Sequence, residues 1–511
     1  MNTVGSGNSS NIAAIDVGSN GIRMMVSRLN MEGGLETLES LRLPVRLGQD
    51  AFTTGQFSDQ TMLMAVDAFL RFRKVAELFE VSQVRVVATS AMREAVNNDL
   101  LIDRIARETG FEVRIITGEE EARLVHLAVK QAVNLTGKTA LLVDIGGGSV
   151  EVLLSDGENI LSTESFGMGT VRILSKLSNH EGELSSFSEL VREYAASARR
   201  YIDLEIGSHR VDICVGTGGN IEEMGRLRKR LFKNRRSDVI TIDDLDRLIE
   251  KLAAMSVEER IHDLGLNPDR ADVILPAAVV LQMITEEAGV DEVHIPGVGL
   301  KDGVLLEMAA VSRGPSLPRR LQVLASVQHM GKKYAYDAEH STATARLAVR
   351  LFDQTLSLHH LTENERLILE AAAMLHDIGH YINTIDHDKH GYYLLMHHPL
   401  LGLTSAEQRI VANLVNYHRK QPPSAASDDF RALPLRDRLA VTKLSVLLRL
   451  ADTLDISHLG RVKDVILEQS QPGRWRLFLI SESEALLEKW ALRKRKSLFQ
   501  EAFGVALEIM P

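Results

Sequence analysis

Cysteine is nearly absent from this sequence, which contains only Cys214 among its 511 residues. No disulfide can form within the chain, so we expect a reducing compartment, the cytoplasm. Long apolar runs are also missing, since none reaches the roughly 18 residues that a membrane span requires. The first ten residues are polar and lack the basic-then-apolar order of a secretory signal. We therefore expect neither secretion nor a membrane partner.

An overall excess of basic residues is absent as well. The formal net charge of -10 at pH 7 argues against general nucleic-acid binding, although a local basic surface can still attract a polyanion. We therefore expect no specific nucleic-acid partner. Apolar residues make up 45% of the chain, which is enough for several hydrophobic cores, and the length predicts about three or four domains.

A strand-turn-strand pattern at residues 141–152 is the most informative segment. An apolar strand ends at Asp144, a glycine-rich turn follows, and a second apolar strand carries Glu151. The amides of such a turn can approach a phosphate closely, and the two carboxylates could hold a divalent cation, Mg²⁺, against phosphate oxygens. The turn residues that would contact phosphate are Gly146, Gly147, Gly148 and Ser149. An ordinary glycine-rich hairpin with two solvated acids would show the same pattern.

The N-terminal region repeats this pattern at residues 12–21, where an apolar strand leads through Asp16 to small polar residues. A second strand, rather than a helix, follows each turn, which disfavours P-loop and dinucleotide-binding sites. Ser19 and Asn20 in the first turn are candidates for contacts to successive phosphates. Both copies continue into strands alternating with helices. We therefore predict two related α/β domains that face each other across a cleft.

These motifs together resemble the actin/Hsp70/sugar-kinase superfamily and, within it, the exopolyphosphatase and guanosine pentaphosphatase family. Six motifs appear in the order typical of that family: Asp16–Asn20, Ala88–Ala95, Thr117–Arg123, Asp144–Glu151, Phe166–Gly169 and Gly216–Gly219. The family's usual Thr is replaced here by Val150, at a strand position that we expect to face outward.

The resemblance implies a Mg²⁺-dependent hydrolase that releases a terminal phosphoryl group, and it implies a homodimer. It assigns the general base to Glu121, because the family's base directly precedes an Ala-Arg pair. From the residues alone, three acids at a helix start equally suit the helix dipole. Arg93 could place a guanidinium fork on one phosphate, and a surface ion pair with Glu94 or another neighbour is the alternative.

The sequence leaves the role of two further segments undecided. Gly216–Asn220 follows a strand and precedes a helix, so Gly218 is a candidate contact to another phosphate or to a nucleotide base, and a structural turn fits as well. Seven of the eleven residues between positions 226 and 236 are basic. This run could guide a long phosphate chain toward the cleft, or it could be an ordinary solvated face.

A linker at residues 313–318 precedes a region in which helices replace strands. Thr362 and Glu365 predict a capping box at the start of one helix, and Gly379 predicts its end. Four residues of metal-binding type fall on three predicted helices: His340, His376, Asp377 and Asp452. Their order resembles that of the HD-domain metal phosphohydrolases, which implies a metal ion here. Two imidazoles and two carboxylates suit Mn²⁺ or Fe²⁺ better than Mg²⁺.

Alternatives remain for this helical region. Each histidine alone could be a satisfied core residue, and the four residues together could be a vestige. Other histidines could extend the site to a second metal ion: His380, His390, His397, His398 and His418.

The expected fold class is α/β, with two actin-like domains at residues 1–134 and 135–312. We expect an all-α HD-like domain at 319–458 and a small α/β domain at 459–511. The leading functional hypothesis is an exopolyphosphatase that releases terminal orthophosphate from linear polyphosphate. Guanosine pentaphosphate is the alternative substrate, and the cleft motifs do not separate the two. A non-catalytic nucleotide-binding regulator is a rival, disfavoured by the presence of Glu121.

Overall fold

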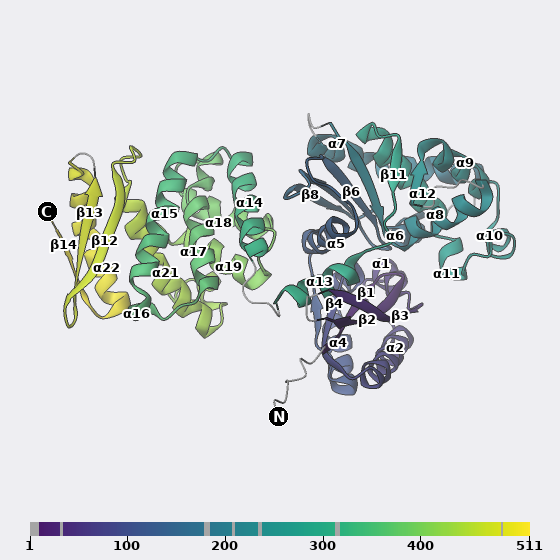
Figure 1. The fold of residues 1–511 in the computed structure, drawn as a ribbon, viewed down its shortest axis with the longest axis horizontal. Helices are drawn as coiled ribbons and strands as arrows, with labels where there is room; N and C mark the ends of the chain where they lie inside the picture. Colours follow the sequence, from purple (N-terminus) through teal and green to yellow (C-terminus); the bar gives the residue numbers. More distant parts are fainter. Residues whose placement is uncertain are drawn as a thin grey trace, which may run out of the picture. The chain divides into compact units, whose positions relative to one another are not determined.

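The computed structural model divides into two compact units, residues 1–316 (unit 1) and 317–511 (unit 2) (Figure 1). The structure describes residues 10–30, 34–177, 184–206, 210–232, 238–311, 317–481 and 484–510. Most of the expected linker at 313–318 lies outside these described residues. None of the helices in the described ranges is long and apolar enough to span a bilayer.

The first sheet of unit 1 has five strands in the order β3-β2-β1-β4-β5. The first three strands form an antiparallel meander, and β4 and β5 join it in parallel. Ser58 caps the long helix α2 as expected, because its Oγ accepts the Thr61 amide at 3.3 Å. The elements are β1 (Ser10–Gly18), β2 (Gly21–Leu29), β3 (Leu35–Leu43), α1 (Leu47–Thr53), α2 (Asp59–Leu78), β4 (Val81–Ala88), α3 (Ser90–Glu94), α4 (Asn98–Thr109), β5 (Val113–Ile115) and α5 (Gly118–Ala132).

The second sheet has six strands in the order β10-β11-β9-β6-β7-β8. Read from β8 to β11, it repeats the meander and the parallel additions of the first sheet. This repeat confirms the predicted pair of related α/β domains. The elements are β6 (Ala140–Ile145), β7 (Val150–Ser155), β8 (Ile160–Phe166), α6 (Thr170–Leu177), α7 (Leu184–Ile206), β9 (Ile213–Thr217), α8 (Gly219–Phe232), β10 (Val239–Thr241), α9 (Ile242–Ala253), α10 (Val257–His262), α11 (Pro268–Ala271), α12 (Ile274–Ala288), β11 (Glu292–His294) and α13 (Leu300–Val311).

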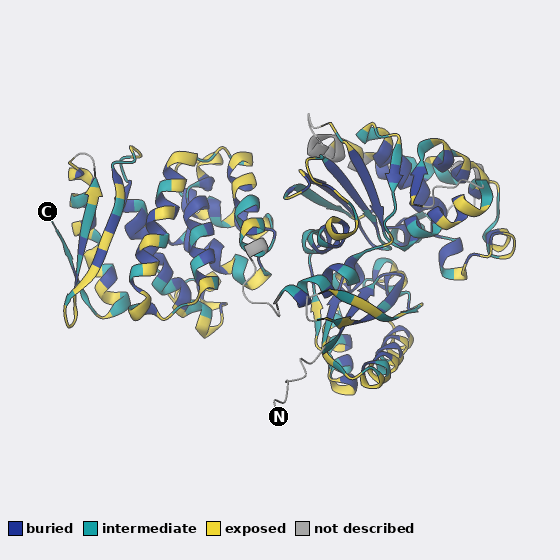
Figure 2. Cartoon of the chain, viewed as in Figure 1, coloured by how far each residue is buried: buried dark blue, intermediate teal, exposed yellow. Residues whose placement is uncertain are grey.

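The central strands of both sheets are buried along most of their length (Figure 2). Their near-continuous apolar runs are typical of strands covered on both faces. The expectation that Val150 faces outward is wrong, because it is fully buried in the core of the second sheet. Its apolar side chain suits that position.

Unit 1 thus has two α/β halves, one around the first sheet and one around the second, and two helices connect them. α5 packs against β7 and β8, and α13 packs against α5, β1 and β2. The α5–α13 contact is very close at Gly303, where an added Cβ would overlap the backbone of Leu124. The glycine therefore lets α13 fix the position of α5, the helix that carries Glu121.

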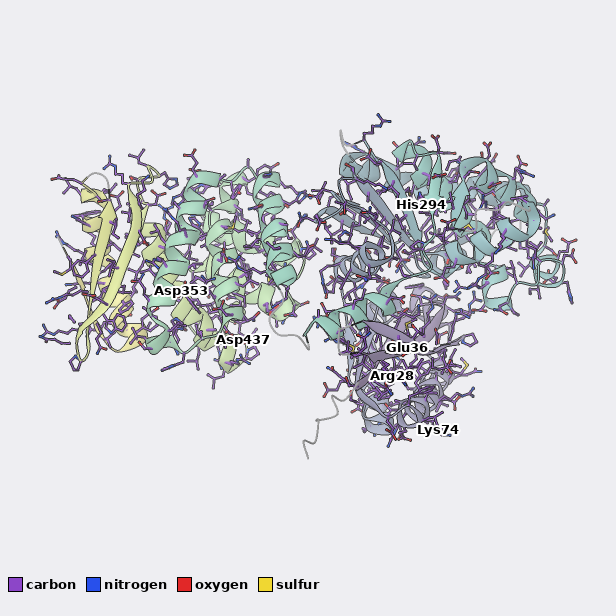
Figure 3. All side chains as sticks on the ribbon, viewed as in Figure 1. Arg28, Glu36, Lys74, His294, Asp353 and Asp437 are labelled. Carbon is purple, nitrogen blue, oxygen red and sulfur yellow. The ribbon has the colours of Figure 1, made fainter. Side chains whose placement is uncertain are left out.

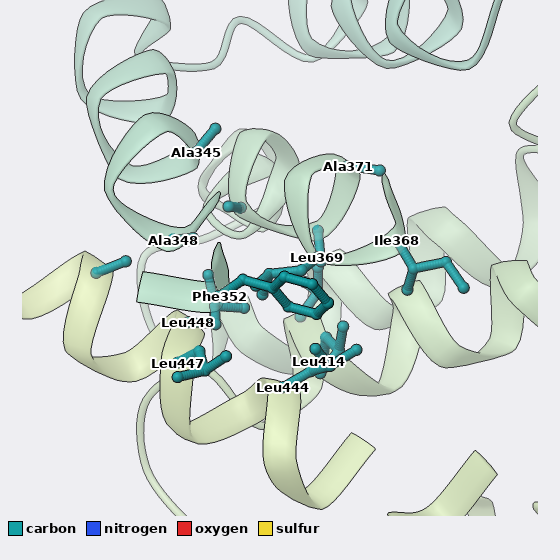
Figure 4. Packing of buried hydrophobic residues seen from close by; sticks show 14 of the residues in the cluster. Ala345, Ala348, Phe352, Ile368, Leu369, Ala371, Leu414, Leu444, Leu447 and Leu448 are labelled. Atoms are coloured by element: carbon teal, nitrogen blue, oxygen red, sulfur yellow. The ribbon is translucent and has the colours of Figure 1, made fainter. Parts of the chain in front are cut away.

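Unit 2 is a helical assembly followed by a three-stranded sheet in the order β12-β13-β14. Its helices and its sheet share one hydrophobic core, and Figure 4 shows Phe352 among leucines of neighbouring helices. The elements are α14 (Leu317–Lys333), α15 (Ala338–Gln354), α16 (Leu356–His359), α17 (Glu363–Leu375), η1 (Ile378–Tyr381), α18 (His387–His397), α19 (Ser405–Asn416), α20 (Asp428–Arg431), α21 (Leu435–Leu454), β12 (Val462–Gln471), β13 (Arg474–Ser481), α22 (Leu486–Phe503) and β14 (Ala506–Ile509).

The predicted capping box of Thr362 and Glu365 is present at the start of α17. Gly379 does not end that helix, contrary to expectation. α17 stops at Leu375, and Gly379 lies within the short 3-10 helix η1. A glycine is needed there for space, because an added Cβ would overlap the carbonyl oxygen of His387.

Figure 3 labels several charged surface residues, among them Arg28, Glu36 and Asp353, and these three pair with nearby residues. Arg28 on β2 and Glu36 on β3 are register partners, with Nη1 and Oε2 3.3 Å apart. Asp353 on α15 accepts from Arg366 on α17 at 2.7 Å. Such exposed pairs contribute little to stability, so the buried charges described below carry the functional argument.

Candidate active site

The two strand-turn-strand segments present matched residue pairs at their turn ends. Strand register places Asp16 opposite Arg23, and Asp144 opposite Glu151. Directly opposite residues of an antiparallel pair project from the same face. One copy therefore presents an acid beside a cation, and the other copy presents two acids. Asp16, Arg23 and Asp144 line one cleft between the halves of unit 1.

A third carboxylate from α5 joins the two acids of the second copy. Glu121, Asp144 and Glu151 each offer an oxygen within 4.8 Å of the other two. Glu121 and Glu151 are buried, and the Oε2 atom of each has no hydrogen-bond partner. The other oxygen of Glu151 accepts from the Ser165 hydroxyl at 2.8 Å. Burying a carboxylate oxygen without a hydrogen-bond partner costs free energy. Coordination to a hard divalent cation would satisfy both oxygens.

The pKa values of this carboxylate cluster are raised. Burial raises the pKa of Asp144 to about 6. Burial, with the neighbouring charge of Asp144, raises the pKa of Glu151 to about 7. Burial and the charges of Glu151, Asp144 and Asp16 raise the pKa of Glu121 well above its usual range. Excess negative charge in a buried site is the condition that a bound cation relieves.

We expect Asp144→Asn to stabilise metal-free protein in a pH-dependent way. The folded-state pKa of Asp144, about 6, lies above its ordinary value of 3.8. This group's stabilising contribution is therefore complete below pH 3.8 and is lost as the pH rises through 6. Because Asn does not titrate, the stability of the variant relative to wild type should rise by about 2 kcal/mol between about pH 4.5 and 8. Urea unfolding in chelator at both pH values measures this change, and a pH-independent difference would contradict it.

Three basic side chains line the same cleft, namely Arg23, Arg270 and Lys301. Burial, with the charges of Arg23 and Arg42 nearby, lowers the pKa of Arg270 to about 9. Crowded cations of this kind favour a polyanionic ligand. The sequence prediction missed all three. Only Arg23 had a signal in the sequence, since its distance from Asp16 equals that of Glu151 from Asp144.

Ser19 and Asn20 both line the cleft. The Ser19 hydroxyl shares a hydrogen bond with the Ser90 hydroxyl at 3.0 Å. The Asn20 amide is already engaged, because Nδ2 donates to the Asp269 carbonyl at 2.8 Å and Oδ1 accepts from Arg46 Nε at 3.0 Å. A phosphate contact through Asn20 stays a prediction. Asn20 ties the first turn to the second half of unit 1.

The glycine turn of the second copy is only partly open to the cleft. Gly146, Gly147 and Ser149 line it, and Gly148 is not among the described lining residues. An added Cβ at Gly148 would lie 2.7 Å from the Ser19 hydroxyl, so this glycine packs against the first turn. The Gly146 amide donates to the Ser149 carbonyl at 3.0 Å. Phosphate contacts through Gly146 and Gly148 stay predictions.

Gly218 lines the cleft with a φ of 93°, a conformation that favours glycine. An added Cβ would also lie 2.7 Å from Oδ1 of Asp144. Gly218 is therefore a turn residue that also lies in the cleft wall, and its contact to a phosphate or to a nucleotide base stays a prediction.

Arg93 is not among the described lining residues. Its Nη1 donates to the Ile116 carbonyl at 2.6 Å, yet its charge lowers the pKa of both Glu121 and Glu151 and so acts on the cluster. The alternative pairing with Glu94 is not observed, because Glu94 accepts two hydrogen bonds from Arg172. A phosphate contact through Arg93 stays a prediction.

The basic run is less exposed than expected. Arg228 is buried, with Nε 2.6 Å from Asp244 Oδ2, and Arg226 pairs with Glu223 at 2.9 Å. Residues 226–232 of the run lie in the C-terminal half of α8, whose N-terminal end lines the cleft. Lys233, Arg235 and Arg236 lie outside the described residues.

Arg228 and Lys229 should therefore respond differently to charge reversal. Arg228→Glu would place two acids together in a buried site, and we expect it to destabilise unit 1 by at least about 3 kcal/mol. The exposed Lys229→Glu should leave stability within about 0.5 kcal/mol. If the run binds substrate, Lys229→Glu should weaken long-chain polyphosphate more than short oligophosphate and reduce the salt dependence of binding. Equal affinities for wild type and Lys229→Glu would leave Lys229 as a solvated residue.

In unit 2 the structure brings the four predicted residues together. His340 Nε2 lies 3.1 Å from His376 Nε2 and 3.8 Å from Asp452 Oδ1, and Asp377 Oδ2 lies 3.5 Å from His376 Nε2. Of the additional histidines, His418 reaches Asp377 Oδ1 at 3.5 Å and the half-exposed His380 lies at 3.7 Å. The other three are not part of this cluster: His390, His397 and His398.

Sequence reasoning missed His387 and Asp455. His387 Nε2 lies 3.3 Å from Asp377 Oδ1, and Asp455 Oδ2 lies 2.8 Å from His340 Nδ1. Nothing in the local pattern separates His387 from the neighbouring exposed histidines, because its position depends on the close approach of η1 to α18.

Two α/β halves with the same strand order, on either side of a cleft lined by carboxylates and cations, form an actin-like fold with a site suited to phosphate chemistry. The family model described as "Ppx/GppA phosphatase family" matches residues 26–311, more than half of the chain. A second model, "Ppx/GppA phosphatase, domain III", matches residues 324–498. The chain belongs to the Ppx/GppA phosphatase family, whose members are hydrolases acting on phosphoanhydrides.

The chain is similar to known proteins over much of its length. The chain is 27% identical to a guanosine-5'-triphosphate,3'-diphosphate pyrophosphatase of Photobacterium profundum over 441 residues, which cover 86% of this chain and 84% of that protein. A protein of the same name from Vibrio vulnificus is 28% identical over 415 residues, covering 81% and 82%. The crystal structure of an exopolyphosphatase from Cytophaga hutchinsonii is 26% identical, with a TM-score of 0.56, and covers 59% of this chain and 98% of that one.

Proposed function

We propose that unit 1 is a Mg²⁺-dependent exopolyphosphatase that releases orthophosphate from the end of linear polyphosphate. The observation that carries this proposal is the opposition of two charge sets in one cleft. The carboxylates Glu121 and Asp144 line this cleft, and the buried Glu151 belongs to the same cluster. Basic side chains line the cleft as well. One set suits a hard cation, and the other suits a chain of phosphates.

Glu121 is the proposed general base. It lies near the start of α5, buried, with one carboxylate oxygen unpartnered. That oxygen would hold the attacking water and accept its proton as the water oxygen bonds to the terminal phosphorus. The bond from phosphorus to the bridging oxygen then breaks, and the shortened chain leaves with the bond's electron pair. Arg23, Arg270 and Lys301 would balance the charge on the phosphate oxygens.

Asp144 and Glu151 are the residues that would hold Mg²⁺ beside this base. The fit rests on the unpartnered Glu151 oxygen and on the all-carboxylate donor set, since Mg²⁺ prefers oxygen ligands. When bound, the ion would neutralise phosphate oxygens and help orient the terminal group. Ser165 orients one oxygen of Glu151 by donating a hydrogen bond to it, which leaves the other free.

The composition of the cleft wall supports a phosphate chain as ligand. Among the described lining residues, Ile145 and Leu300 are the only apolar side chains, and none is aromatic. A purine base would therefore find no aromatic stacking partner in the wall of this cleft. A chain of phosphates needs none.

Guanosine pentaphosphate is a second candidate substrate, favoured by a specific observation. The two relatives that match along more than four fifths of both chains carry the name guanosine-5'-triphosphate,3'-diphosphate pyrophosphatase. The chemistry at the terminal phosphate would be the same, with the nucleoside outside the described cleft wall.

A direct comparison of kcat/KM for the two substrates tests the assignment. Orthophosphate release from long-chain polyphosphate and from guanosine pentaphosphate should be measured with the same enzyme, at the same Mg²⁺ and salt concentrations. We expect the larger kcat/KM with polyphosphate. A larger value with guanosine pentaphosphate would assign the second substrate. A cytoplasmic location and a homodimer stay predictions from the single cysteine and the family resemblance.

A further inference from the structure

Arg270 is a cation that the fold holds in an electrostatically unfavourable position. The residue lines the cleft and is only 8% exposed, and its Nη1 donates to Asn220 Oδ1 at 2.7 Å. Burial, with the charges of Arg23 and Arg42, lowers the pKa of Arg270 to about 9, and the charge of Asp269 opposes this shift. A guanidinium that is buried near two others is repelled by them. The backbone that carries Arg270 must therefore be anchored if the side chain is to stay in the cleft.

That backbone is a short segment of the second half of unit 1. Arg270 lies in α11, a single turn of four residues, and the Asn267 side chain makes no capping hydrogen bond at its start. So short a helix has little stability of its own. Arg260 on α10 supports it from within the second half, because Nη1 donates to the Ala271 carbonyl at 3.0 Å. Further contacts come from the first half.

Two arginines of the first half pair with the acids on either side of Arg270. Arg46, which directly precedes α1, donates through Nη2 to both carboxylate oxygens of Asp272, at 3.1 and 2.8 Å. Arg42 on β3 pairs through Nη2 with Asp269 Oδ2. At most 28% of each of these four side chains is exposed, so solvent screens the two pairs less than it screens pairs at the open surface.

Asn20 links the two arginine contacts. Its Nδ2 donates to the Asp269 carbonyl at 2.8 Å, and its Oδ1 accepts from Arg46 Nε at 3.0 Å. Its own carbonyl accepts from Arg42 Nη2 at 3.1 Å. The first strand-turn-strand segment, both arginines and the backbone of α11 therefore form one connected network across the two halves.

We propose that Arg42 and Arg46 are positioning residues for Arg270. Each holds an acid that precedes or follows Arg270 in the sequence, and so keeps the Arg270 guanidinium where the phosphate oxygens of the substrate would lie. Neither arginine, nor its acidic partner, is among the described residues that line the cleft, so this role is indirect. The inference rests on the proposed function, in which Arg270 balances phosphate charge.

The sign of two single substitutions separates positioning from the bare effect of charge. Asp272→Asn removes a negative charge near a cleft for a polyanion, so charge alone would tighten binding, whereas Arg46→Gln would weaken it. Positioning predicts that both variants bind polyphosphate more weakly, because each one breaks the same ion pair. We expect Kd to rise about five- to tenfold in both, the effect of loosening one charge-assisted contact to phosphate.

Equilibrium binding of polyphosphate of defined length to the full chain measures these effects, in Mg²⁺ and with Glu121→Gln as the parent so that no chain is consumed. The double variant Arg46→Gln/Asp272→Asn should bind as weakly as either single variant, since all three lack the same pair. If charge alone acted, the two substitutions would cancel. The same cycle on Arg42 and Asp269 is the second test, and it serves if urea unfolding shows that a variant of the first pair does not fold.

Arg270→Gln shows whether the pairs act through Arg270. In that background Asp272→Asn should not weaken binding further, because the side chain that it displaces is already gone. The control is Glu36→Gln, which breaks the ion pair of Arg28 with Glu36, an exposed pair within the first half with a separation of 3.3 Å. It should leave Kd unchanged.

Three results would overturn this inference alone. They are tighter binding by Asp272→Asn, a double variant that binds like the parent, and an undiminished effect of Asp272→Asn in the Arg270→Gln background. A parent protein that does not bind polyphosphate would instead contradict the proposed function, on which the inference rests.

Discussion

Glu121→Gln should lower kcat for orthophosphate release by about two to four orders of magnitude, the usual contribution of a positioned general base. Gln keeps the size of the side chain but cannot accept the proton of water. Binding of the phosphate chain should be equal or tighter, because the variant removes one negative charge from the buried cluster of Asp144 and Glu151. Kd by equilibrium binding and kcat by single-turnover orthophosphate release measure the two effects separately.

Glu120→Gln is the matched control, since it changes the adjacent residue of the same helix. The Glu120 carboxylate pairs with Arg123 at 2.7 Å and belongs to no carboxylate cluster in the described chain. Its kcat should stay within a few-fold of wild type. A Glu121→Gln enzyme that turns over within a few-fold of wild type, or a Glu120→Gln enzyme that loses activity instead, would assign the base elsewhere.

Removing either acid of the second hairpin should raise the Mg²⁺ requirement of the reaction. Asp144→Asn and Glu151→Gln each remove a charge from an oxygen-only site, and carboxylate charge is a main determinant of divalent-cation affinity. We expect the Mg²⁺ concentration for half-maximal rate to rise at least about tenfold in each variant, which corresponds to about 1.4 kcal/mol. Excess Mg²⁺ should restore part of the rate.

The control is Glu158→Gln, which removes an exposed carboxylate that pairs with Lys130 at 2.6 Å at the far end of β7. Its Mg²⁺ titration should match that of wild type. Unchanged titrations for both Asp144→Asn and Glu151→Gln would leave these acids with structural roles only. Asp144→Asn tests the account in two ways, because the same substitution should raise the Mg²⁺ requirement and should stabilise the metal-free protein at high pH.

The repeated strand-turn-strand pattern was sufficient to predict the two α/β halves and the position of the carboxylates. Both are local features, since an apolar strand, a turn and a register fix which residues share a face. The same register relates Arg23 to Asp16. Arg23 could therefore have been predicted from the sequence, whereas Arg270 and Lys301 come from distant helices.

The errors arose where a residue's role depends on contacts across the fold. Arg228 has the residue type of a solvated basic run, but Asp244 pairs with it in the interior. Gly379 has the residue type of a helix terminus, but it serves a close backbone approach. In each case a distant partner decides between roles that the local sequence permits equally.

Hydrolysis in water enriched in oxygen-18 tests most directly whether this chain transfers a terminal phosphoryl group to water. Polyphosphate of defined length is incubated with the full chain and Mg²⁺ for less than one turnover per terminus. Our account predicts one labelled oxygen in each released orthophosphate, no label in the shortened chain, and loss of the product with Glu121→Gln. Label in the remaining chain, unlabelled orthophosphate, or undiminished release by Glu121→Gln would contradict the account.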